Sequence, residues 1–466
     1  MRLLSLLALT PLVSALANYT NSTNSSSVLI ESNADDFQYR GVALGGWLVL
    51  EPYITPSLFE AFNGSEVPVD EYHFCEQLGE EEATKRLNKH WSTFYSEDDF
   101  KAIKSYGLNM VRIPIGYWAF QTLESDPYVG GAQSYLDQAI QWAQMNELKV
   151  WIDLHGVPGS QNGFDNSGLR DIGYPGWFNS TENLDLTYKV LHQIFVKYGG
   201  GVFGQKYKDT ILGIEVVNEP FSPVLGLDEI AEFYTTAYEE ARNIQVINNT
   251  IIFHDAFARI GYWNEFMSDR SPTGNNTNEN YNILIDHHHY EVFGEGVKNN
   301  ITTHLQNIVN YASSIEEELT HHPAVVGEWS AALTDCTPWL NGIGLGSRYA
   351  GEQPYNFNKT GSCENINNFQ KWSKQQKKNY RKFIEIQLDQ YTSKTRGYIF
   401  WCFKTEDTIE WDFKRLVELD LMPQPLNNFT YIVNGTDTDR KKNMGMKNGV
   451  SGLLALANLM LLAIFL

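Results

Sequence analysis

The run ILGIEVVNE (211–219) begins with apolar residues and ends on an amide and a carboxylate. Seven other runs have the same form, with Val, Ile or aromatic residues first and polar side chains last. In chain order those seven are YRGVALGGW (39–47), NMVRIPIG (109–116), KVWIDLHG (149–156), TIIFHDA (250–256), NILIDHHHY (282–290), AVVGEWS (324–330) and YIFWCFKTE (398–406). Such runs are typical of strands that are buried on both faces.

Amphipathic segments lie between these runs. Three clear examples are SYLDQAIQWAQMNEL (134–148), DEIAEFYTTAYEEARNI (228–244) and WSKQQKKNYRKFIEIQLDQY (372–391). A strand followed by a helix, eight times over, predicts a (β/α)8 barrel in a single α/β catalytic domain, residues 38–430. A doubly wound open sheet is the alternative, and it is disfavoured because no glycine-rich phosphate loop follows the first strand.

Polar side chains stand at the ends of the predicted strands. They are Arg112, His155, Asn218 with Glu219, His254, His288 with Tyr290, Glu328, and Trp401. In a barrel these strand ends meet at one rim, which is where the active sites of this fold lie. We therefore expect a functional site there.

Glu219 and Glu328 are the two carboxylates of this set, and they end the fourth and seventh predicted strands, which are not adjacent. Either one alone could be a salt-bridged carboxylate of the barrel rim. Burying both without compensation would cost several kcal/mol, so an accidental pair is improbable. Two carboxylates across a cleft are the arrangement used for glycoside hydrolysis, and their separation distinguishes retention from inversion.

Seven longer segments resemble the fungal exo-β-1,3-glucanases of glycoside hydrolase family five. They are RGVALGGWLVLEPYITPSLFE (40–60), RIPIGYWAFQ (112–121), DLHGVPGSQNGFDNSG (153–168), VNEP (217–220), DHHHYEVF (286–293), GEWSAALTDC (327–336) and FWCFKTEDTIEWD (400–412). The resemblance extends from about residue 38 to 425, nearly the whole predicted domain.

The resemblance implies a role for each residue of the site. Glu219 resembles the general acid/base and Glu328 the nucleophile of a retaining mechanism. Arg112 would keep Glu328 ionised, and Asn218 would hold the sugar 2-hydroxyl. His288 and Tyr290 would bind sugar and also orient the nucleophile, and His155 would bind sugar hydroxyls. Trp401 would form a stacking floor, and Glu51 would help to close the pocket. Phe164 and Phe293 would contact the next glucose.

The resemblance also implies a disulfide between Cys336 and Cys363, and it leaves the state of Cys75 and Cys402 open. No cofactor is implied. The histidine run at 287–289 could suggest a metal site, but neighbours on a strand point to opposite faces, so we expect no metal.

The activity implied is release of glucose from the non-reducing ends of β-1,3-glucan during fungal cell-wall glucan metabolism. A β-glucan transglycosylase or a β-1,6-glucanase on the same fold is an alternative, because sequence alone does not determine linkage preference or the competition between water and sugar. A non-catalytic glucan-binding wall protein is disfavoured, because every member of the catalytic set is present.

Both ends of the chain carry targeting signals. Residues 1–17 are typical of a signal peptide, and residues 18–37 form a polar, sequon-rich segment. A polar spacer (431–449) precedes an apolar tail (450–466), which predicts replacement by a glycosylphosphatidylinositol (GPI) anchor. Asn443 is the preferred attachment site and Asn434 the second choice, while a membrane-spanning tail is the competing interpretation.

Charge and glycosylation signals agree with an extracellular protein. The formal net charge is −21, which argues against nucleic acid as a partner because phosphates would be repelled. Eleven N-glycosylation sequons begin at Asn18, Asn21, Asn24, Asn63, Asn179, Asn248, Asn275, Asn300, Asn358, Asn428 and Asn434. We expect a secreted monomer, at the cell wall or anchored to the outer face of the plasma membrane.

Overall fold

The computed structural model describes residues 37–62, 66–244, 247–267 and 281–438. All eight predicted runs contain a strand. The strands are β1 (Tyr39–Ala43), β2 (Met110–Gly116), β3 (Lys149–Gly156), β4 (Ile211–Glu215), β5 (Thr250–His254), β6 (Ile283–His288), β7 (Ala324–Trp329) and β8 (Gly397–Phe400). They are parallel, pair in chain order and close on themselves through β1 and β8. The predicted (β/α)8 barrel is confirmed.

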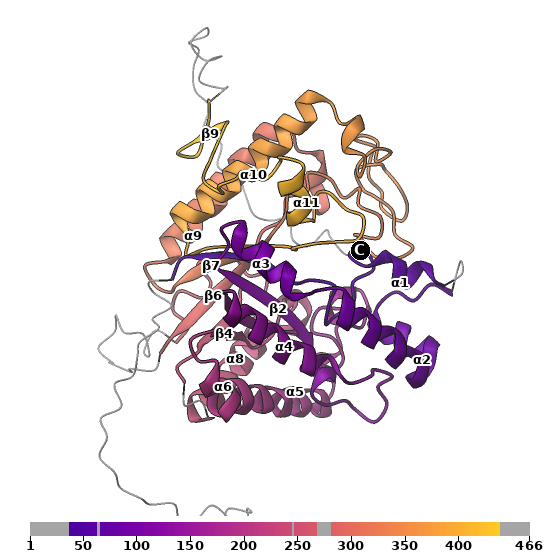
Figure 1. Ribbon diagram of the computed structural model, residues 1–466, viewed down its shortest axis with the longest axis vertical. Helices are drawn as coiled ribbons and strands as arrows, with labels where there is room; N and C mark the ends of the chain where they lie inside the picture. Colours follow the sequence, from indigo (N-terminus) through magenta and orange to yellow (C-terminus); the bar gives the residue numbers. More distant parts are fainter. Residues whose placement is uncertain (1–36, 63–65, 245–246, 268–280, 439–466) are drawn as a thin grey trace, which may run out of the picture. The chain divides into compact units, whose positions relative to one another are not determined.

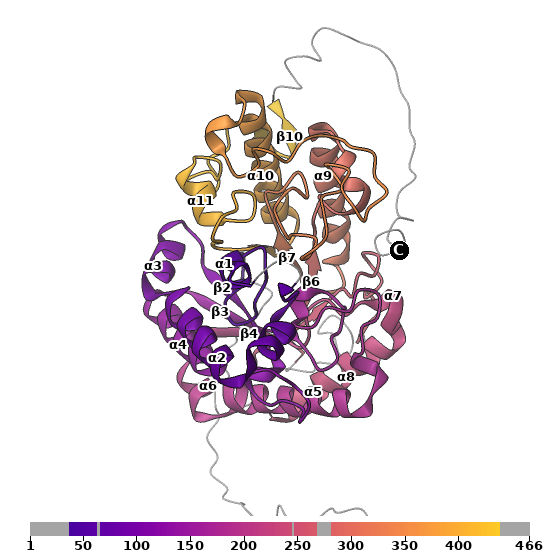
Figure 2. The same cartoon turned by 90° about the vertical axis from the view of Figure 1, so that its right-hand side faces the viewer.

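Helices surround the strands (Figure 1). They are α1 (Pro56–Glu60), α2 (Glu71–Thr93), α3 (Glu97–Ser105), α4 (Ala132–Met145), α5 (Thr181–Ile194), α6 (Val202–Lys206), α7 (Ser222–Leu225), α8 (Leu227–Ile244), α9 (Ile301–Glu318), α10 (Lys374–Lys394) and α11 (Phe413–Glu418). The three predicted helices correspond to α4, α8 and α10. Helices α9 and α10 lie side by side in both views (Figures 1 and 2).

Near the N-terminal ends of the strands, the barrel interior is filled by one apolar side chain from each strand. These eight buried residues belong to a single cluster: Tyr39, Met110, Trp151, Leu212, Ile252, Leu284, Val325 and Ile399. A second, larger cluster contains the alternate strand residues, such as Val111 and Ile152, together with the inner faces of the helices. The period of two along the strands thus separates the interior from the helix-facing core, except in β4, where the register against β3 shifts.

Charged residues form the next layer of the barrel interior, toward the C-terminal ends of the strands. Two residues after Met110, Trp151 and Leu284 come Arg112, Asp153 and Asp286, and Glu215 ends β4. All four charged side chains are fully buried. The apolar layer near the N-terminal ends of the strands supports the charged layer. Together the two layers position the residues at the rim.

Glu219 does not end the fourth strand, contrary to expectation. Strand β4 stops at Glu215, and the chain continues beside β3, where the Asn218 amide donates to the Leu154 carbonyl at 3.0 Å. Glu219 then has a left-handed φ of 47°, which turns the chain away before Pro220. Trp401 likewise lies one residue beyond β8.

A short hairpin follows the barrel, formed by β9 (Ile432–Val433) and β10 (Thr436–Asp437). It lies in the region that we placed in the polar spacer. Its start is held to α10, because the Glu385 carboxylate accepts from the amides of Thr430, Tyr431 and Ile432. The expected signal peptide, the apolar tail and Asn443 lie outside the described residues. Among the described helices, none is long and apolar enough to cross a membrane.

Candidate active site

His288 lies between the two predicted catalytic carboxylates. Its Nδ1 is 2.7 Å from Oε1 of Glu219 and 3.4 Å from Oε2 of Glu328. These two distances together place the carboxylate oxygens within about 6.1 Å of each other. Retaining glycosidases hold their carboxyl groups about 5–5.5 Å apart, and inverting enzymes about 6.5–9.5 Å. The bound applies to this one pair of oxygens, Oε1 of Glu219 and Oε2 of Glu328, and is compatible with the retaining arrangement.

The Arg112 guanidinium binds Glu328 and two further side chains of the site. One guanidinium nitrogen, Nη1, is 2.6 Å from Oε1 of Glu328. Nη2 donates to Glu215 at 2.8 Å and to Oδ1 of Asn218 at 2.7 Å. The planar guanidinium therefore fixes both the Glu328 carboxylate and the Asn218 amide, as a point-charge lysine could not.

Glu328 accepts hydrogen bonds at both oxygens, and Asn218 keeps a donor free. The Tyr290 hydroxyl donates to Oε2 of Glu328 at 2.7 Å, opposite the Arg112 contact. With Oδ1 of Asn218 bound to Arg112, its amide nitrogen is buried and has no partner within the described part of the chain. A buried donor without a partner is costly, so it is poised for a ligand hydroxyl.

The pKa directions of the three central groups show where the protons lie. Burial favours a neutral His288, but the charges of Glu328 and Asp286 and the contact with Glu219 raise its pKa well above the usual value. Burial raises the pKa of Glu219, and the hydrogen bond and charge of His288 outweigh it, so the net direction is downward. Both pKa directions favour a protonated His288 beside an ionised Glu219.

Burial has the largest influence on Glu328 and raises its pKa. His288 and Arg112 act in the opposite direction, and the negative charge of Glu219 adds to the increase. The charge of Arg112 thus lowers the pKa of Glu328 but does not decide the net direction, which is upward. Two donors at the Glu328 oxygens still match an ionised carboxylate.

Comparison with known proteins identifies the family. The family model for cellulase (glycosyl hydrolase family 5) matches residues 75–341. The chain belongs to glycoside hydrolase family 5. This family 5 hydrolase is 58% identical to "Glucan 1,3-beta-glucosidase 2" of Candida albicans, over 91% of each chain. It is 49% identical to a "Sporulation-specific glucan 1,3-beta-glucosidase" of Saccharomyces cerevisiae, over 86% of this chain and 89% of the relative.

Solved structures share the fold of this family 5 hydrolase. A rutinosidase from Aspergillus niger superimposes with a TM-score of 0.62, at 19% sequence identity, covering 84% of this chain and 99% of that one. The structure described as AoRut gives a TM-score of 0.61 at 20% identity, covering 83% and 97%. At this level of identity the likeness concerns the fold alone.

Trp401, the predicted stacking floor, lies next to His155 in the family 5 hydrolase. The Trp401 indole stacks against the His155 ring, with centroids 5.3 Å apart and an interplanar angle of 8°. Its Nε1 donates to the Tyr53 hydroxyl at 2.6 Å. His155 is held through Nδ1 by Asp153 at 2.6 Å, and its Nε2 is buried without a partner among the described residues.

Glu51, Phe164 and Phe293 lie in three different segments, which follow β1, β3 and β6. Glu51 is buried, and burial together with the charges of Asp165, Glu328 and Glu219 raises its pKa well above the usual value. Phe164 is half-buried in the loop after β3 and packs edge-on against Phe221. Phe293 follows β6 and packs edge-on against Tyr290.

Sequence reasoning missed the acidic layer beneath the rim. Asp153, Glu215 and Asp286 surround Arg112 and the two site histidines. A signal was present, because IDLH (152–155) and IDHH (285–288) both place an aspartate two residues before a site histidine. Residues two apart on a strand face the same side. Asn166, whose amide donates to Oε2 of Glu219 at 3.1 Å, had no comparable signal.

Two groups within the described residues have the spacing of a metal site: Glu219 with His254 and His288, and Glu215 with Asp286 and His288. Nδ1 of His254 accepts from the Ala256 amide, so its Nε2 carries the proton. Both ring nitrogens of His288 face carboxylates. None of these nitrogens offers a free lone pair in this arrangement.

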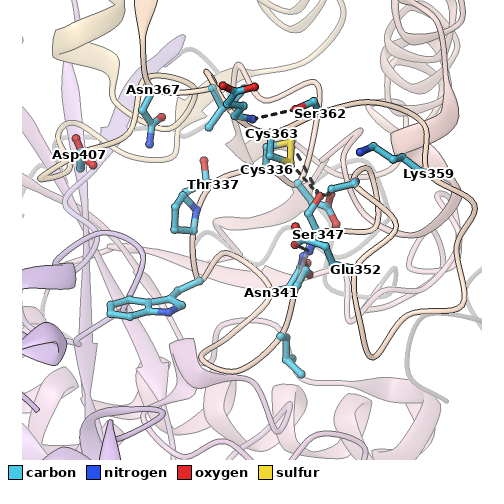
Figure 3. Close-up of a pocket in the computed structure, with 18 of the residues that line it drawn as sticks. Cys336, Thr337, Asn341, Ser347, Glu352, Lys359, Ser362, Cys363, Asn367 and Asp407 are labelled. Carbon is cyan, nitrogen blue, oxygen red and sulfur yellow. Dashed lines mark hydrogen bonds between the residues drawn. A yellow bond between two sulfur atoms is a disulfide. The ribbon is translucent and has the colours of Figure 1, made fainter. Parts of the chain in front are cut away.

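A separate hollow of about 810 Å³ lies within the long loop after β7 (Figure 3). None of the predicted catalytic or substrate residues lines it. The Cys336–Cys363 disulfide, implied by the resemblance, is present at its edge. Cys75 and Cys402 are free and buried, which answers the question left open by the sequence.

Proposed function

We propose that this family 5 hydrolase releases glucose from the non-reducing ends of β-1,3-glucan with retention of anomeric configuration. The observation that carries the proposal is the position of His288, which brings the Glu219 and Glu328 oxygens within about 6.1 Å of each other. The choice of β-1,3-glucan is supported by the relatives at 46–58% identity, whose names are glucan 1,3-β-glucosidases.

In the first half-reaction Glu328 attacks the anomeric carbon while Glu219 protonates the leaving oxygen. Water then takes the place of the leaving group, with Glu219 now acting as the base. The free amide of Asn218 donates to the sugar 2-hydroxyl, a contact that strengthens as charge develops at the anomeric carbon. Arg112 and Tyr290 keep the attacking carboxylate oriented.

We infer that Glu51 makes the enzyme exo-acting. Glu51 is buried near both catalytic carboxylates and binds hydroxyls of the terminal glucose, so the chain cannot extend beyond it. Trp401 provides a flat apolar surface for the sugar face. Phe164 and Phe293 contact the next glucose at the entrance.

Proton NMR of the earliest products tests this function. With laminarin as substrate, β-glucose should appear first and convert to the α-anomer only at the rate of mutarotation. Glu219→Gln and Glu328→Gln should each lower kcat/KM by about a thousandfold or more. Initial α-glucose would exclude retention. Faster release from pustulan than from laminarin would assign the β-1,6 linkage instead, and chain lengthening as the main outcome would indicate a transglycosylase.

We also propose that the protein acts outside the cell as a monomer, held at the wall or outer membrane face by a GPI anchor. The support is the apolar stretch at each end of the chain, the sequons and the polar spacer before residue 450. Treating cells with a phosphatidylinositol-specific phospholipase should release the wild-type protein. Retention with the membrane after treatment would favour a spanning tail.

A further inference from the structure

An aspartate two residues before a histidine occurs on two strands on different sides of the barrel. On β3, Oδ2 of Asp153 is 2.6 Å from Nδ1 of His155. On β6, Oδ2 of Asp286 is 3.2 Å from Nε2 of His288. The two pairs differ at the second ring nitrogen. That of His155 has no partner in the described chain, whereas that of His288 contacts Glu219.

We propose that Asp286 is a positioning residue that keeps a proton on Nε2 of His288, so that Nδ1 is the atom that exchanges a proton with Glu219. His288 thereby becomes the proton reservoir of the acid/base. The inference rests on the acid/base role proposed for Glu219, and it assigns Asp286 a part in the timing of protonation.

The three groups form a continuous chain. Asp286 contacts His288 at 3.2 Å, and His288 contacts Glu219 at 2.7 Å through the opposite ring nitrogen. Asp286 is fully buried, and its other oxygen has no hydrogen-bond partner among the residues described. A buried carboxylate with so few donors is costly, so its charge strongly favours a proton on the ring nitrogen that faces it.

The backbone leaves space for this carboxylate. A Cβ added to Gly327, on the neighbouring strand β7, would lie 1.9 Å from Oδ1 of Asp286. Any other residue at position 327 would displace Asp286 from His288. Because Gly327 of the Gly-Glu-Trp segment has no side chain, the contacts from Asp286 through His288 to Glu219 can form.

The charges around His288 favour protonation on balance. The titratable and charged groups that face it are Arg112 on β2, Glu215 on β4, Glu219 after β4, His254 on β5, Asp286 on β6, Tyr290 after β6 and Glu328 on β7. Arg112 is paired with Glu215 and Glu328. Burial holds the pKa of His254 well below its usual value, so this ring is neutral. The remaining unpaired charge around His288 is therefore negative.

The proton moves between defined atoms. It passes from Nδ1 of His288 to Oε1 of Glu219, which leaves a neutral imidazole whose Nε2–H still donates to Asp286. Glu219 gives this proton to the leaving oxygen as the glycosidic bond breaks and an oxygen of Glu328 bonds to the anomeric carbon. Later Glu219 takes a proton from the attacking water, Glu328 leaves as a carboxylate, and the proton returns to His288.

Asp286→Asn keeps the shape of the side chain and removes its charge. We compare kcat/KM for laminaribiose, whose leaving group needs a proton, with kcat/KM for 2,4-dinitrophenyl β-glucoside, whose leaving group needs none. The variant should lose about thirtyfold on laminaribiose and no more than about threefold on the aryl glucoside. Equal losses on both substrates would overturn the proposal.

Asp153→Asn is the matched control, because it removes the same charge from the equivalent pair on β3. Its losses should be similar for the two substrates. The basic limb of the kcat/KM profile reports loss of the proton shared by His288 and Glu219. In Asp286→Asn this limb should move about one pH unit toward acid. An unmoved limb in Asp286→Asn, or an equal movement in both variants, would count against Asp286.

A measurement on the wild-type protein covers the case of a variant that does not fold. In ¹⁵N-histidine-labelled protein, with His288 assigned by comparison with His288→Gln, Nε2 should remain protonated throughout the active pH range. An unprotonated Nε2 would refute the proposed tautomer. If the wild-type protein cleaves neither laminaribiose nor laminarin, the proposed function fails. If it cleaves them and Nε2 is unprotonated, only the role of Asp286 fails.

Discussion

Arg112 shows how a single side chain organises the site. Its guanidinium reaches Glu215 on β4, Glu328 on β7 and Asn218 beyond β4. The contact of Arg112 with Glu328 was expected from the family resemblance, which links the two residues. Its place in the strand was predicted wrongly, because Arg112 is the third residue of β2 and does not lie at the strand end. The contact with Glu215 was not predictable, because a carboxylate inside an apolar strand gives no indication of its partner.

Tyr290 is the residue whose effect on the nucleophile can be isolated most directly. Tyr290→Phe removes the hydroxyl that donates to Oε2 of Glu328 at 2.7 Å and leaves the ring in place. We expect kcat for laminarin to fall by about tenfold to a hundredfold, because the carboxylate loses one of its two orienting donors. Steady-state kinetics on the purified variant measure the effect.

Tyr311→Phe is the control for that variant. Tyr311, like Tyr290, is a partly buried tyrosine near His288, but among the described residues its hydroxyl contacts only the His288 carbonyl, at 3.5 Å. The control should retain kcat within about twofold, because a contact this long contributes little. If the two variants behaved alike, the hydrogen bond to Glu328 would not be what matters.

At the scale of elements, β6 and β7 are packed so closely that Gly327 cannot be replaced. Gly327→Ala would set a methyl group 1.9 Å from an Asp286 oxygen. We expect a loss of about 2–3 kcal/mol in the free energy of unfolding, because overpacking a core forces strain. Urea unfolding measures this loss. Gly130→Ala, at a glycine whose added Cβ has nothing within 4 Å, should unfold like the wild type.

Helix α2 anchors the segment that carries Glu51. Glu71, its first residue, accepts from the Leu50 amide at 2.8 Å and from the Trp118 indole at 2.9 Å. Burial is the main cause that raises the pKa of Glu71, from 4.5 to about 7. The folded state therefore holds this proton more tightly than the unfolded chain does.

The pKa of Glu71 predicts a pH dependence of stability. The stabilisation is complete below pH 4.5 and is lost as the pH rises through 7, by about 3 kcal/mol in total. Glu71→Gln should remove this part of the slope when urea unfolding is followed between pH 4.5 and 7.5. Glu60→Gln, at an exposed carboxyl on α1, should keep the wild-type slope. A Glu71→Gln slope equal to that of the wild type would contradict the buried-acid interpretation.

At the scale of the whole molecule, the barrel was the most predictable feature. Runs such as KVWIDLHG (149–156) are too apolar for any position except a strand covered on both faces, and β3 occupies the whole of this run. The prediction failed at 211–219, where only the first five residues form β4. Apolar content does not indicate where pairing gives way to a left-handed turn.

The site was predictable in its residues and unpredictable in its distances. Strand-end positions brought Glu219 and Glu328 to one rim, but their separation depends on the turn at Glu219 and on His288 between them. The free state of Cys402, which lies two residues beyond β8, was also not predictable, since a buried cysteine carries no pairing signal.

The net charge of −21 predicts that salt raises stability and leaves activity nearly unchanged. Sodium chloride screens the mutual repulsion of the surface carboxylates, so Tm should rise by several degrees between about 10 and 200 mM salt. Glucan is uncharged, and kcat/KM for laminarin should change less than about twofold over the same range. Calorimetry and initial rates test the two halves separately. A steep fall of kcat/KM with salt would mean that charge guides the substrate.

Trapping the covalent intermediate tests the central claim most directly. Incubation with 2-deoxy-2-fluoro-β-glucosyl fluoride should inactivate the enzyme and add one fluoroglucosyl group, which peptide mass spectrometry should locate on Glu328. Glu328→Gln should remain unlabelled, and Glu219 should carry no sugar in either protein. A label on Glu219 or elsewhere would contradict the assignment of the nucleophile to the carboxylate held by Arg112 and Tyr290. Full hydrolysis with no trapped species would contradict the covalent mechanism itself.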